Sequence, residues 1–292
     1  MNRPIALIAA LLCAGVAISS ACAAQGDDSI RFTLDPDHGT GGKIHANFRQ
    51  DRDGRDHDSW STGFLPSELL GLEVSSFRGT GSRPLHFTLV REAGRLDCSG
   101  TGGSGHAYGG CRFTSDPNFT RLLASRGIGT PTERQAFGLM AVNARRDLID
   151  AVADARYPTP SIDNLTALAA LGVDGRYISE MSHAGYRPNT IQRLIEFKAL
   201  GVTPQWIAGF VRVGYANVPG DGLVQMRALG ITPEFISGYQ RIGYRDLPVE
   251  TLVQLKALDI TPEFVRRAVP AGQSLPSVSH LAELKIFGDR RH

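Results

Sequence analysis

An acidic segment between residues 51 and 58 offers the ligand chemistry that hard cations require. Carboxylates alternate with other residues along it, and calcium prefers carboxylate oxygens. The four carboxylates are Asp51, Asp53, Asp56 and Asp58. The glycine of this segment comes too early for an EF-hand loop, and no glutamate stands at the twelfth position. We therefore expect a solvated hairpin tip and keep the four aspartates as weak metal candidates only.

Histidines in the N-terminal part of the chain are the next candidates for chemistry. They are His38, His45, His57, His86 and His106. A zinc site needs three or four such ligands to converge, and their spacing contains no HExxH pattern. The GxSxG pattern of a serine-hydrolase nucleophile is also absent. We expect surface histidines and no metal, although a catalytic triad built from distant residues stays open.

A glycine-rich segment, residues 100–105, matches the dinucleotide-binding pattern GxGxxG. That motif needs a strand before it and a helix after it, but the residues that follow read as a strand. Cys98 and Cys111 flank the segment and are the two cysteines left after a signal peptide is removed. We expect a hairpin loop closed by a Cys98–Cys111 disulfide, and no cofactor.

Four tyrosines recur at intervals of 29 residues in the C-terminal half. They are Tyr157, Tyr186, Tyr215 and Tyr244. Such a row could bind a peptide or a glycan strand. Alternatively, each tyrosine packs back on its own unit after a helix-ending residue, as residues at that position often do. Both interpretations stay open, and packing is favoured.

The tyrosines are part of a longer internal repeat. Leu-Gly-Val or a variant of it stands at residues 171–173, 200–202, 229–231 and 258–260. A fixed period of this size predicts stacked supersecondary units. In the third copy Thr232 caps a helix that Gly243 ends, and a second helix starts near Pro248. Trp206 and Phe235 are expected in the core.

The first 24 residues predict an export signal. Arg3 precedes an apolar run from Ile5 to Ile18, and small residues follow it. A lipoprotein signal with a lipid anchor on Cys22 is the alternative. No later apolar run approaches 18 residues, so no transmembrane segment is expected in the mature chain. The net charge is only +2 and the basic residues are scattered along the chain, so we expect no nucleic-acid partner.

These patterns predict an α+β protein in which a small antiparallel β domain is followed by a right-handed α-solenoid of helical-hairpin repeats. Alternating apolar and polar residues, as at residues 30–34 and 85–90, predict the strands. We expect a signal peptide at 1–24, a β-rich domain with one disulfide at 25–115, a helical connector at 116–141 and a helical repeat domain at 142–292.

The repeated unit reads Leu-Gly-[Val/Ile]-Thr-Pro-x-[Trp/Phe]-Ile and ends in Gly-Tyr. Over residues 142–287 it resembles the short helical repeats of exported bacterial proteins. It is similar to those that follow the sensor region of some beta-lactam-receptor-type membrane metallopeptidases. The resemblance implies a helical repeat fold. The catalytic helix of those peptidases is missing here, so the resemblance implies no catalytic residue.

Extended repeats without a catalytic signature favour a non-enzymatic role. We expect a periplasmic or secreted binding or scaffolding protein of the bacterial cell envelope, with a protein or peptide partner. Two alternatives stay open: a sensor or regulatory module of an envelope signalling system, and a hydrolase with a non-local active site.

Overall fold

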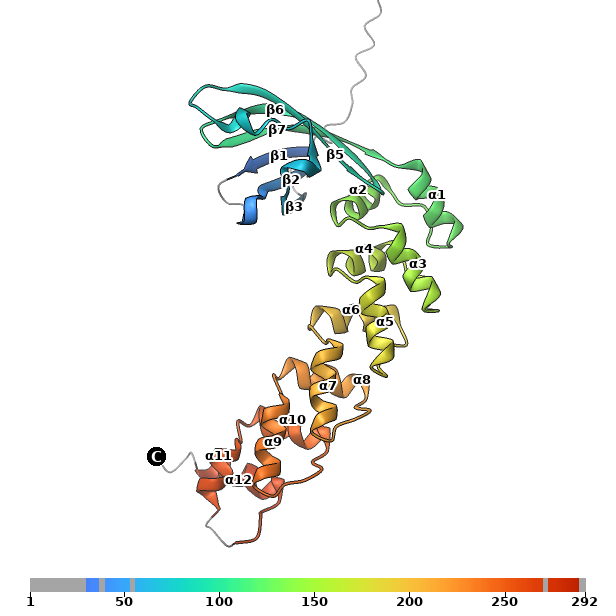
Figure 1. The fold of residues 1–292 in the computed structure, drawn as a ribbon. Helices are drawn as coiled ribbons and strands as arrows, with labels where there is room; N and C mark the ends of the chain where they lie inside the picture. The colour runs from blue at the N-terminus through green and yellow to red at the C-terminus, as the bar shows by residue number, and fades with distance from the viewer. Residues whose placement is uncertain (1–29, 37–39, 53–55, 270–272, 289–292) are drawn as a thin grey trace, which may run out of the picture.

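The structure is a computed structural model that describes residues 30–36, 40–52, 56–269 and 273–288. A curled antiparallel sheet comes first, and a column of short helices follows it (Figure 1). The α+β class expected from the sequence is therefore confirmed. The expected signal peptide and Cys22 lie outside the described residues.

Seven strands form one sheet in the order β3-β2-β1-β7-β6-β5-β4, with neighbouring strands antiparallel. Their bounds are β1 (Ile30–Asp35), β2 (Ile44–Arg52), β3 (Asp56–Phe64), β4 (Leu69–Leu70), β5 (Arg83–Arg91), β6 (Gly94–Gly103) and β7 (His106–Ser115). We call this curled sheet the half-barrel. Short 3-10 turns at Thr40–Gly42, Pro66–Glu68 and Val74–Phe77 connect its strands.

The half-barrel buries one face through the two-residue period of its strands. Phe32, Phe48 and Phe87 are each at most 2% exposed. The rings of Phe32 and Phe87 meet edge to face at 5.0 Å, and Phe48 stacks on Trp60 at 4.9 Å. Such aromatic pairs add about 0.5–1.5 kcal/mol each beyond the burial of their area. The strand alternation read from the sequence therefore produces an aromatic core.

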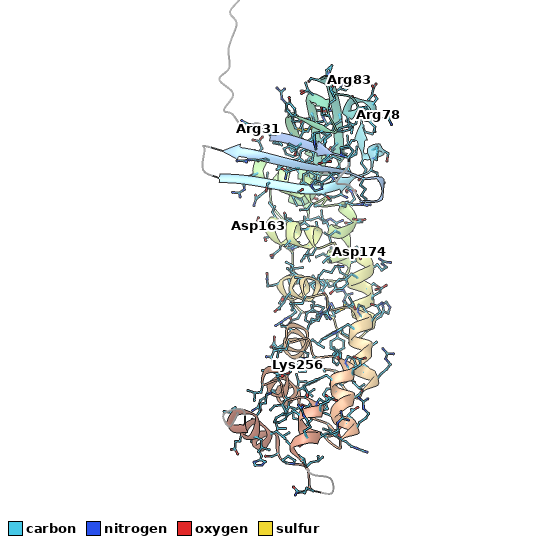
Figure 2. All side chains as sticks on the ribbon, turned by 90° about the vertical axis from the view of Figure 1, so that its left-hand side faces the viewer. Arg31, Arg78, Arg83, Asp163, Asp174 and Lys256 are labelled. Carbon is cyan, nitrogen blue, oxygen red and sulfur yellow. A yellow bond between two sulfur atoms is a disulfide. The ribbon has the colours of Figure 1, made fainter. Side chains whose placement is uncertain are left out.

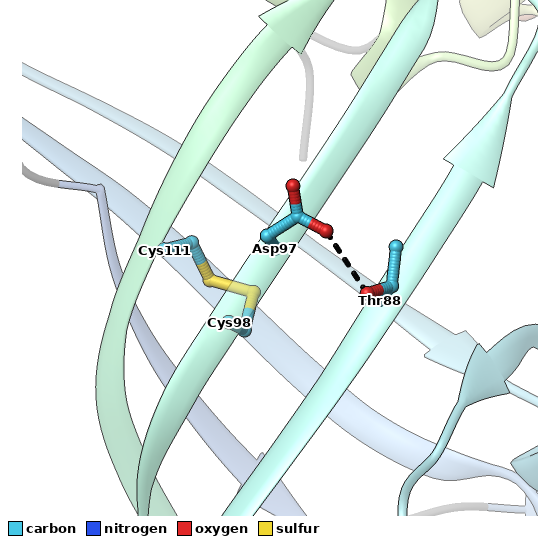
Figure 3. The surroundings of a disulfide bond; sticks show 4 residues. All are labelled: Thr88, Asp97, Cys98 and Cys111. Atoms are coloured by element: carbon cyan, nitrogen blue, oxygen red, sulfur yellow. Dashed lines mark hydrogen bonds between the residues drawn. A yellow bond between two sulfur atoms is a disulfide. The ribbon is translucent and has the colours of Figure 1, made fainter.

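The predicted disulfide is present and joins two neighbouring strands (Figure 3). Cys98 of β6 lies directly opposite Cys111 of β7 in the strand register. Cys98 is 4% exposed, so the bond lies largely within the core. A crosslink over a separation of 13 residues stabilises a domain by roughly 3 kcal/mol in the chain-entropy account.

A pair of facing glycines lets the β6–β7 hairpin approach itself closely. Gly100 and Gly109 are opposite each other. A Cβ on Gly109 would lie 2.2 Å from the carbonyl oxygen of Ser99, and one on Gly100 would lie 2.1 Å from that of Tyr108. No side chain fits at either position, so the curl of the sheet depends on these two glycines.

Helices occupy the rest of the described chain and begin at fixed intervals. The first helix of each pair is α1 (Pro117–Ser125), α3 (Arg146–Asp154), α5 (Gly175–His183), α7 (Pro204–Arg212), α9 (Pro233–Arg241) or α11 (Pro262–Ala268). The second is α2 (Glu133–Ala141), α4 (Ile162–Ala170), α6 (Ile191–Ala199), α8 (Gly220–Ala228), α10 (Val249–Ala257) or α12 (Val278–Gly288). Successive members of each series start 29 residues apart. The period therefore reaches back through α1 and α2, into the segment expected to be a connector.

The ends of helices α1 to α10 repeat with the same spacing because a residue with a left-handed backbone follows each of them. After the odd-numbered helices these residues are Gly127, Arg156, Gly185, Gly214 and Gly243, with φ between 55° and 103°. After the even-numbered helices they are Asn143, Gly172, Gly201, Gly230 and Asp259, with φ between 50° and 69°. The following N–H group then bonds back into the helix, as Val173 does to the carbonyl of Leu168 at 2.9 Å. The expected role of Gly243 as a helix end is thus confirmed.

The tip of the β5–β6 hairpin ties the half-barrel to the helices. Arg91 donates to the carbonyls of Met140 and Ala141 at the end of α2, at 2.7 and 2.6 Å. Its neighbour Glu92 accepts from the N–H of Arg146 at 2.8 Å, at the start of α3. A cation thus sits at one helix C-terminus and an anion at the next N-terminus, which complements both dipoles.

Arg91 is held by rings as well as by carbonyls. Its guanidinium lies 5.0 Å from the Trp60 ring centroid and 5.4 Å from that of Phe64. Burial lowers the pKa of Arg91 from its usual value, and the nearby Glu68 carboxylate partly offsets this effect. One side chain therefore links β3, β5 and α2.

Gly109→Ala should destabilise the protein by about 2–3 kcal/mol, because the added methyl group overlaps the backbone of β6. Gly110→Ala is the matched control, since its Cβ meets nothing closer than 3.9 Å. Urea unfolding measures both. Equal stability of the two variants would show that the hairpin does not need this close approach.

Arg91→Gln should lower the free energy of unfolding by about 2–3 kcal/mol, because charged hydrogen bonds to the end of α2 are lost. Hydrogen exchange of α2 amides should rise more than that of the α9 and α10 amides. The exposed Arg83 supplies the control, Arg83→Gln, with little expected change. Uniform exchange along the column in Arg91→Gln would contradict a local anchoring role.

Candidate interface on the helical repeats

Residues that the sequence offered for metal or nucleotide chemistry do not assemble into a site among the described residues. No group of three or more His, Cys, Asp or Glu side chains in this part of the chain could hold a metal ion. Asp53 lies outside the described residues, and only the backbone of Asp51, Asp56 and Asp58 is described, within β2 and β3. The four aspartates therefore remain weak candidates.

Two of the five histidines and the glycine-rich segment have contacts of another kind, whereas His38 and the side chain of His57 lie outside what the structure describes. His45 shares a hydrogen bond of 2.9 Å with Ser61, and His106 faces Asp35 at 3.5 Å. Residues 100–105 run from β6 through the turn at Ser104 and Gly105 to β7. The expected hairpin is confirmed, and no helix follows to receive a phosphate.

We call the four periodic tyrosines the tyrosine ladder, and three of them connect one unit to the next. Tyr215 and Tyr244 donate their hydroxyl groups to the carbonyls of Leu247 and Pro276, both at 2.6 Å. The hydroxyl of Tyr186 accepts from the N–H of Val218 at 2.9 Å. Each bond spans 32 residues and reaches the connection inside the following unit. These three hydroxyl groups therefore hold neighbouring repeat units together by hydrogen bonds.

Tyr157 begins the ladder in a different way. It is 8% exposed, and the guanidinium of Arg187 lies 5.4 Å from its ring centroid. Arg187 also donates to the carbonyl of Arg156 at 2.9 Å, at the end of α3. Burial raises the pKa of Tyr157, and the nearby Arg187 partly offsets this effect. A binding role for the four tyrosines stays a prediction.

A second periodic feature, which sequence reasoning missed, links the two helices of each of the last four units. A lysine or arginine near the end of the second helix lies over an aromatic ring at the start of the first. The pairs, with cation-to-centroid distances, are Lys198 over Tyr177 (4.4 Å), Arg227 over Trp206 (5.5 Å), Lys256 over Phe235 (5.2 Å) and Lys285 over Phe264 (5.3 Å). We call these four pairs the cation–aromatic row. In the sequence, the 29-residue recurrence of these four cations could have revealed the row.

This row corrects the expected place of two aromatic residues. Trp206 and Phe235 are half-buried, whereas Ile207 and Phe210 beside Trp206 are at most 1% exposed. The ring of Trp206 packs on Phe210 at 4.5 Å with one face inward and meets Arg227 with the other. An aromatic residue at this position stabilises a surface cation instead of filling the core.

The cations of the row are presented at regular intervals along the column. Side chains cover this column along its length, and Lys256 marks the row (Figure 2). Arg227 is exposed and also donates to the carbonyl of Leu200 at 2.8 Å, at the end of α6 in the preceding unit. Its position is therefore fixed by two units. A partner that carries carboxylates could approach such fixed cations at little entropic cost.

A notch interrupts the regular surface between α6 and α8. α8 begins with Gly220, where the other even-numbered helices begin with a larger residue. The hollow beside it has a volume of about 450 Å³. Its walls include Tyr186, Arg187 and Arg193, and Arg193 is ion-paired with Asp221 and, at 2.7 Å, with Glu196. The notch combines an aromatic edge with paired charges.

Neither the known protein families nor the curated proteins supply a relative of this chain. No model of a known protein family matches the chain, and no curated protein matches it. The resemblance to metallopeptidase-associated repeats therefore stays a prediction. Among the described helices, none is long and apolar enough to cross a bilayer.

Burial gives the repeats a specific response to alkaline pH. The pKa of Tyr177 is raised to about 12, mainly by burial and secondly by the neighbouring Tyr157. Its hydroxyl donates to the carbonyl of Val202 at 2.8 Å. The unfolded chain loses this proton near pH 10 and the folded chain near pH 12, so the stabilisation is complete below pH 10 and is lost above it.

Raising the pH from 10 to 12 should therefore lower the free energy of unfolding by roughly 2–3 kcal/mol through Tyr177 alone. Tyr177→Phe should be less stable at pH 8, because it lacks the hydrogen bond to Val202, yet it should lose less stability over this range. Denaturant titrations at each pH measure this difference. Parallel profiles for the two proteins would contradict the assignment.

Proposed function

We propose that this chain is a non-enzymatic, exported binding or scaffolding protein of the bacterial cell envelope. It holds a protein or peptide partner against its helical repeats, which we infer to form a right-handed α-solenoid. We place the mature chain in the periplasm or outside the cell. The disulfide supports this location, because such bonds persist in oxidising compartments.

The observation that carries the proposal is the cation–aromatic row. Four successive units carry the same pair at the same 29-residue interval. One pair would stabilise one unit by about 0.5–1 kcal/mol. Four pairs also create a line of cations with fixed spacing, which is how stacked repeats present an extended binding surface. We infer a partner segment with carboxylates along its length.

The notch beside Gly220 distinguishes one position on this otherwise repetitive surface. It lies at one position along the column, whereas the row repeats. A side chain of the partner that enters the notch would fix the register of binding, since the other contacts recur in each unit. The row would then supply attraction, and the notch would supply alignment.

A sensor or regulatory role is the second candidate, and the hairpin tip favours it. Arg91 and Glu92 contact two successive helices. A conformational change in the half-barrel would therefore reach the column of helices through the tip of the β5–β6 hairpin. The resemblance to repeats that follow a metallopeptidase sensor region points the same way. In this role, the half-barrel would bind a ligand and the helices would contact a partner.

Affinity capture from envelope extract tests the leading proposal. The bait variant combines Lys198→Gln, Arg227→Gln and Lys256→Gln. The control combines Arg212→Gln and Arg241→Gln, which remove exposed charges from the last turns of α7 and α9. We expect wild type and control to retain the same partner, identified by mass spectrometry, and the row variant to lose it because its cations are gone.

Circular dichroism melting shows whether the variants remain folded. Capture that survives loss of the row, or that fails in the control instead, would contradict the row as the interface. A hydrolytic activity of the purified chain, abolished by substitution of a defined residue cluster, would overturn the non-enzymatic assignment.

A further inference from the structure

The column of helices ends on an apolar surface in its last unit, the pair α11 and α12. Ala268 of α11 and Leu284 of α12 are exposed there, and we call the surface around them the terminal face. We propose that the terminal face binds the terminal face of a second copy of this chain. The result is a head-to-head dimer with two-fold symmetry.

The repeat itself identifies what Leu284 lacks. The even-numbered helices carry a large apolar residue at this position, and in the five preceding helices it is at most 2% exposed. These residues are Leu139, Leu168, Phe197, Met226 and Leu255. Leu284 is 36% exposed, whereas Leu281 on the same helix stays fully buried. α12 is therefore packed on the preceding unit, and the side that faces onward along the column has lost its cover.

The layer between the last two units shows what covers the equivalent residue. Leu255 of α10 and Tyr239 of α9 form one hydrophobic cluster with Val265 of α11 and Leu281 of α12. Leu255 is thus buried by the two helices of the following unit. Leu284 requires a cover of the same kind, which is a pair of short helices with apolar side chains. A second copy of this chain presents such a pair at its own terminal face.

Ala268 lies on the same side of the last unit as Leu284 and leaves room beside it. The equivalent residues one unit earlier, Tyr239 and Leu255, share a cluster, so the two positions are neighbours. The five preceding odd-numbered helices carry a larger residue at the position of Ala268, at most 2% exposed. These residues are Leu123, Val152, Met181, Phe210 and Tyr239. Leu284 of a second copy can pack over this small alanine, and the two-fold axis repeats the contact.

The opposite end of the column cannot receive a terminal face, because the half-barrel covers it. Phe113 of β7 meets Phe137 of α2 edge to face at 5.5 Å, and Arg91 binds the end of α2. Figure 1 shows the half-barrel at the end that carries α1 and α2, with α11 and α12 at the opposite end. A head-to-tail series of copies would need two uncovered ends. One uncovered end in the described column permits a closed pair, in which both copies use the same surface.

Charges beside the terminal face can match themselves across a two-fold axis. Arg267 and Glu283 are exposed, and they adjoin Ala268 and Leu284 in the sequence. Both signs of charge therefore flank the same apolar patch. Two copies can place the arginine of one near the glutamate of the other, whereas a face with a single sign of charge would repel its own copy.

Dimerisation would double the surface that we propose for partner binding. Each copy contributes its own cation–aromatic row, and the two half-barrels would lie at the far ends of the assembly. A partner with repeated binding segments could then engage both rows and gain avidity. This consequence rests on the proposed function, whereas the dimer itself does not.

Sedimentation equilibrium of the full chain over a series of concentrations tests the dimer. We expect a monomer–dimer equilibrium. Leu284→Lys should raise the dissociation constant about tenfold or more, because it places a charge within the apolar contact. Ile286→Lys is the matched control. Ile286 is 44% exposed on the same helix but lies about 200° around it from Leu284, so this variant should dimerise as wild type does.

Ala268→Glu tests the terminal face from α11 and should weaken the dimer as well. Circular dichroism melting of dilute protein shows whether each variant keeps the fold of the monomer. Small-angle X-ray scattering tests the geometry, since a head-to-head dimer is much longer than the monomer and a side-by-side dimer is not. A monomer at every concentration, a dimer that survives both Leu284→Lys and Ala268→Glu, or a dimer no longer than the monomer would overturn the proposal.

Discussion

The helical part of this protein depends on a single constraint, which is that every unit must have the same length. Left-handed residues set this length, because each ends a helix at a fixed position and returns the chain to the stack. Glycine meets the requirement at most positions. Arg156, Asn143 and Asp259 adopt the same conformation at a greater conformational cost, which shows that the geometry is imposed by the stack.

Equal lengths allow the same lateral bonds to form in successive units. Tyrosine hydroxyl groups reach the backbone of the next unit over 32 residues, and cations lie over aromatic rings within a unit. An insertion of one residue would break both sets in the affected unit. The aromatic side chains therefore act mainly as connectors between neighbours, and the surface cations that they hold become a regular feature of the exterior.

The half-barrel joins this column through the hairpin tip, and the joint follows the rules of helix capping. α3 begins at Arg146 without a side-chain cap of its own, and Glu92 accepts its N–H instead. Arg91 binds the carbonyl end of α2 in the same way. The end of α2 and the start of α3 thus take their capping groups from the sheet, and these hydrogen bonds join the two parts.

Much of the architecture follows from local sequence alone. The strands near Phe32 and Phe87, the Cys98–Cys111 pair and the helix end at Gly243 are set by alternation, cysteine count and backbone preference, which act over a few residues. The 29-residue period is also local, although the drifted first pair, α1 and α2, concealed its start. What only the tertiary structure decided is which side chains meet: Lys198 over Tyr177, Arg91 at the end of α2, and Tyr215 at the carbonyl of Leu247. Such contacts depend on distances between segments remote in the chain, and those distances exist only once the whole core has packed.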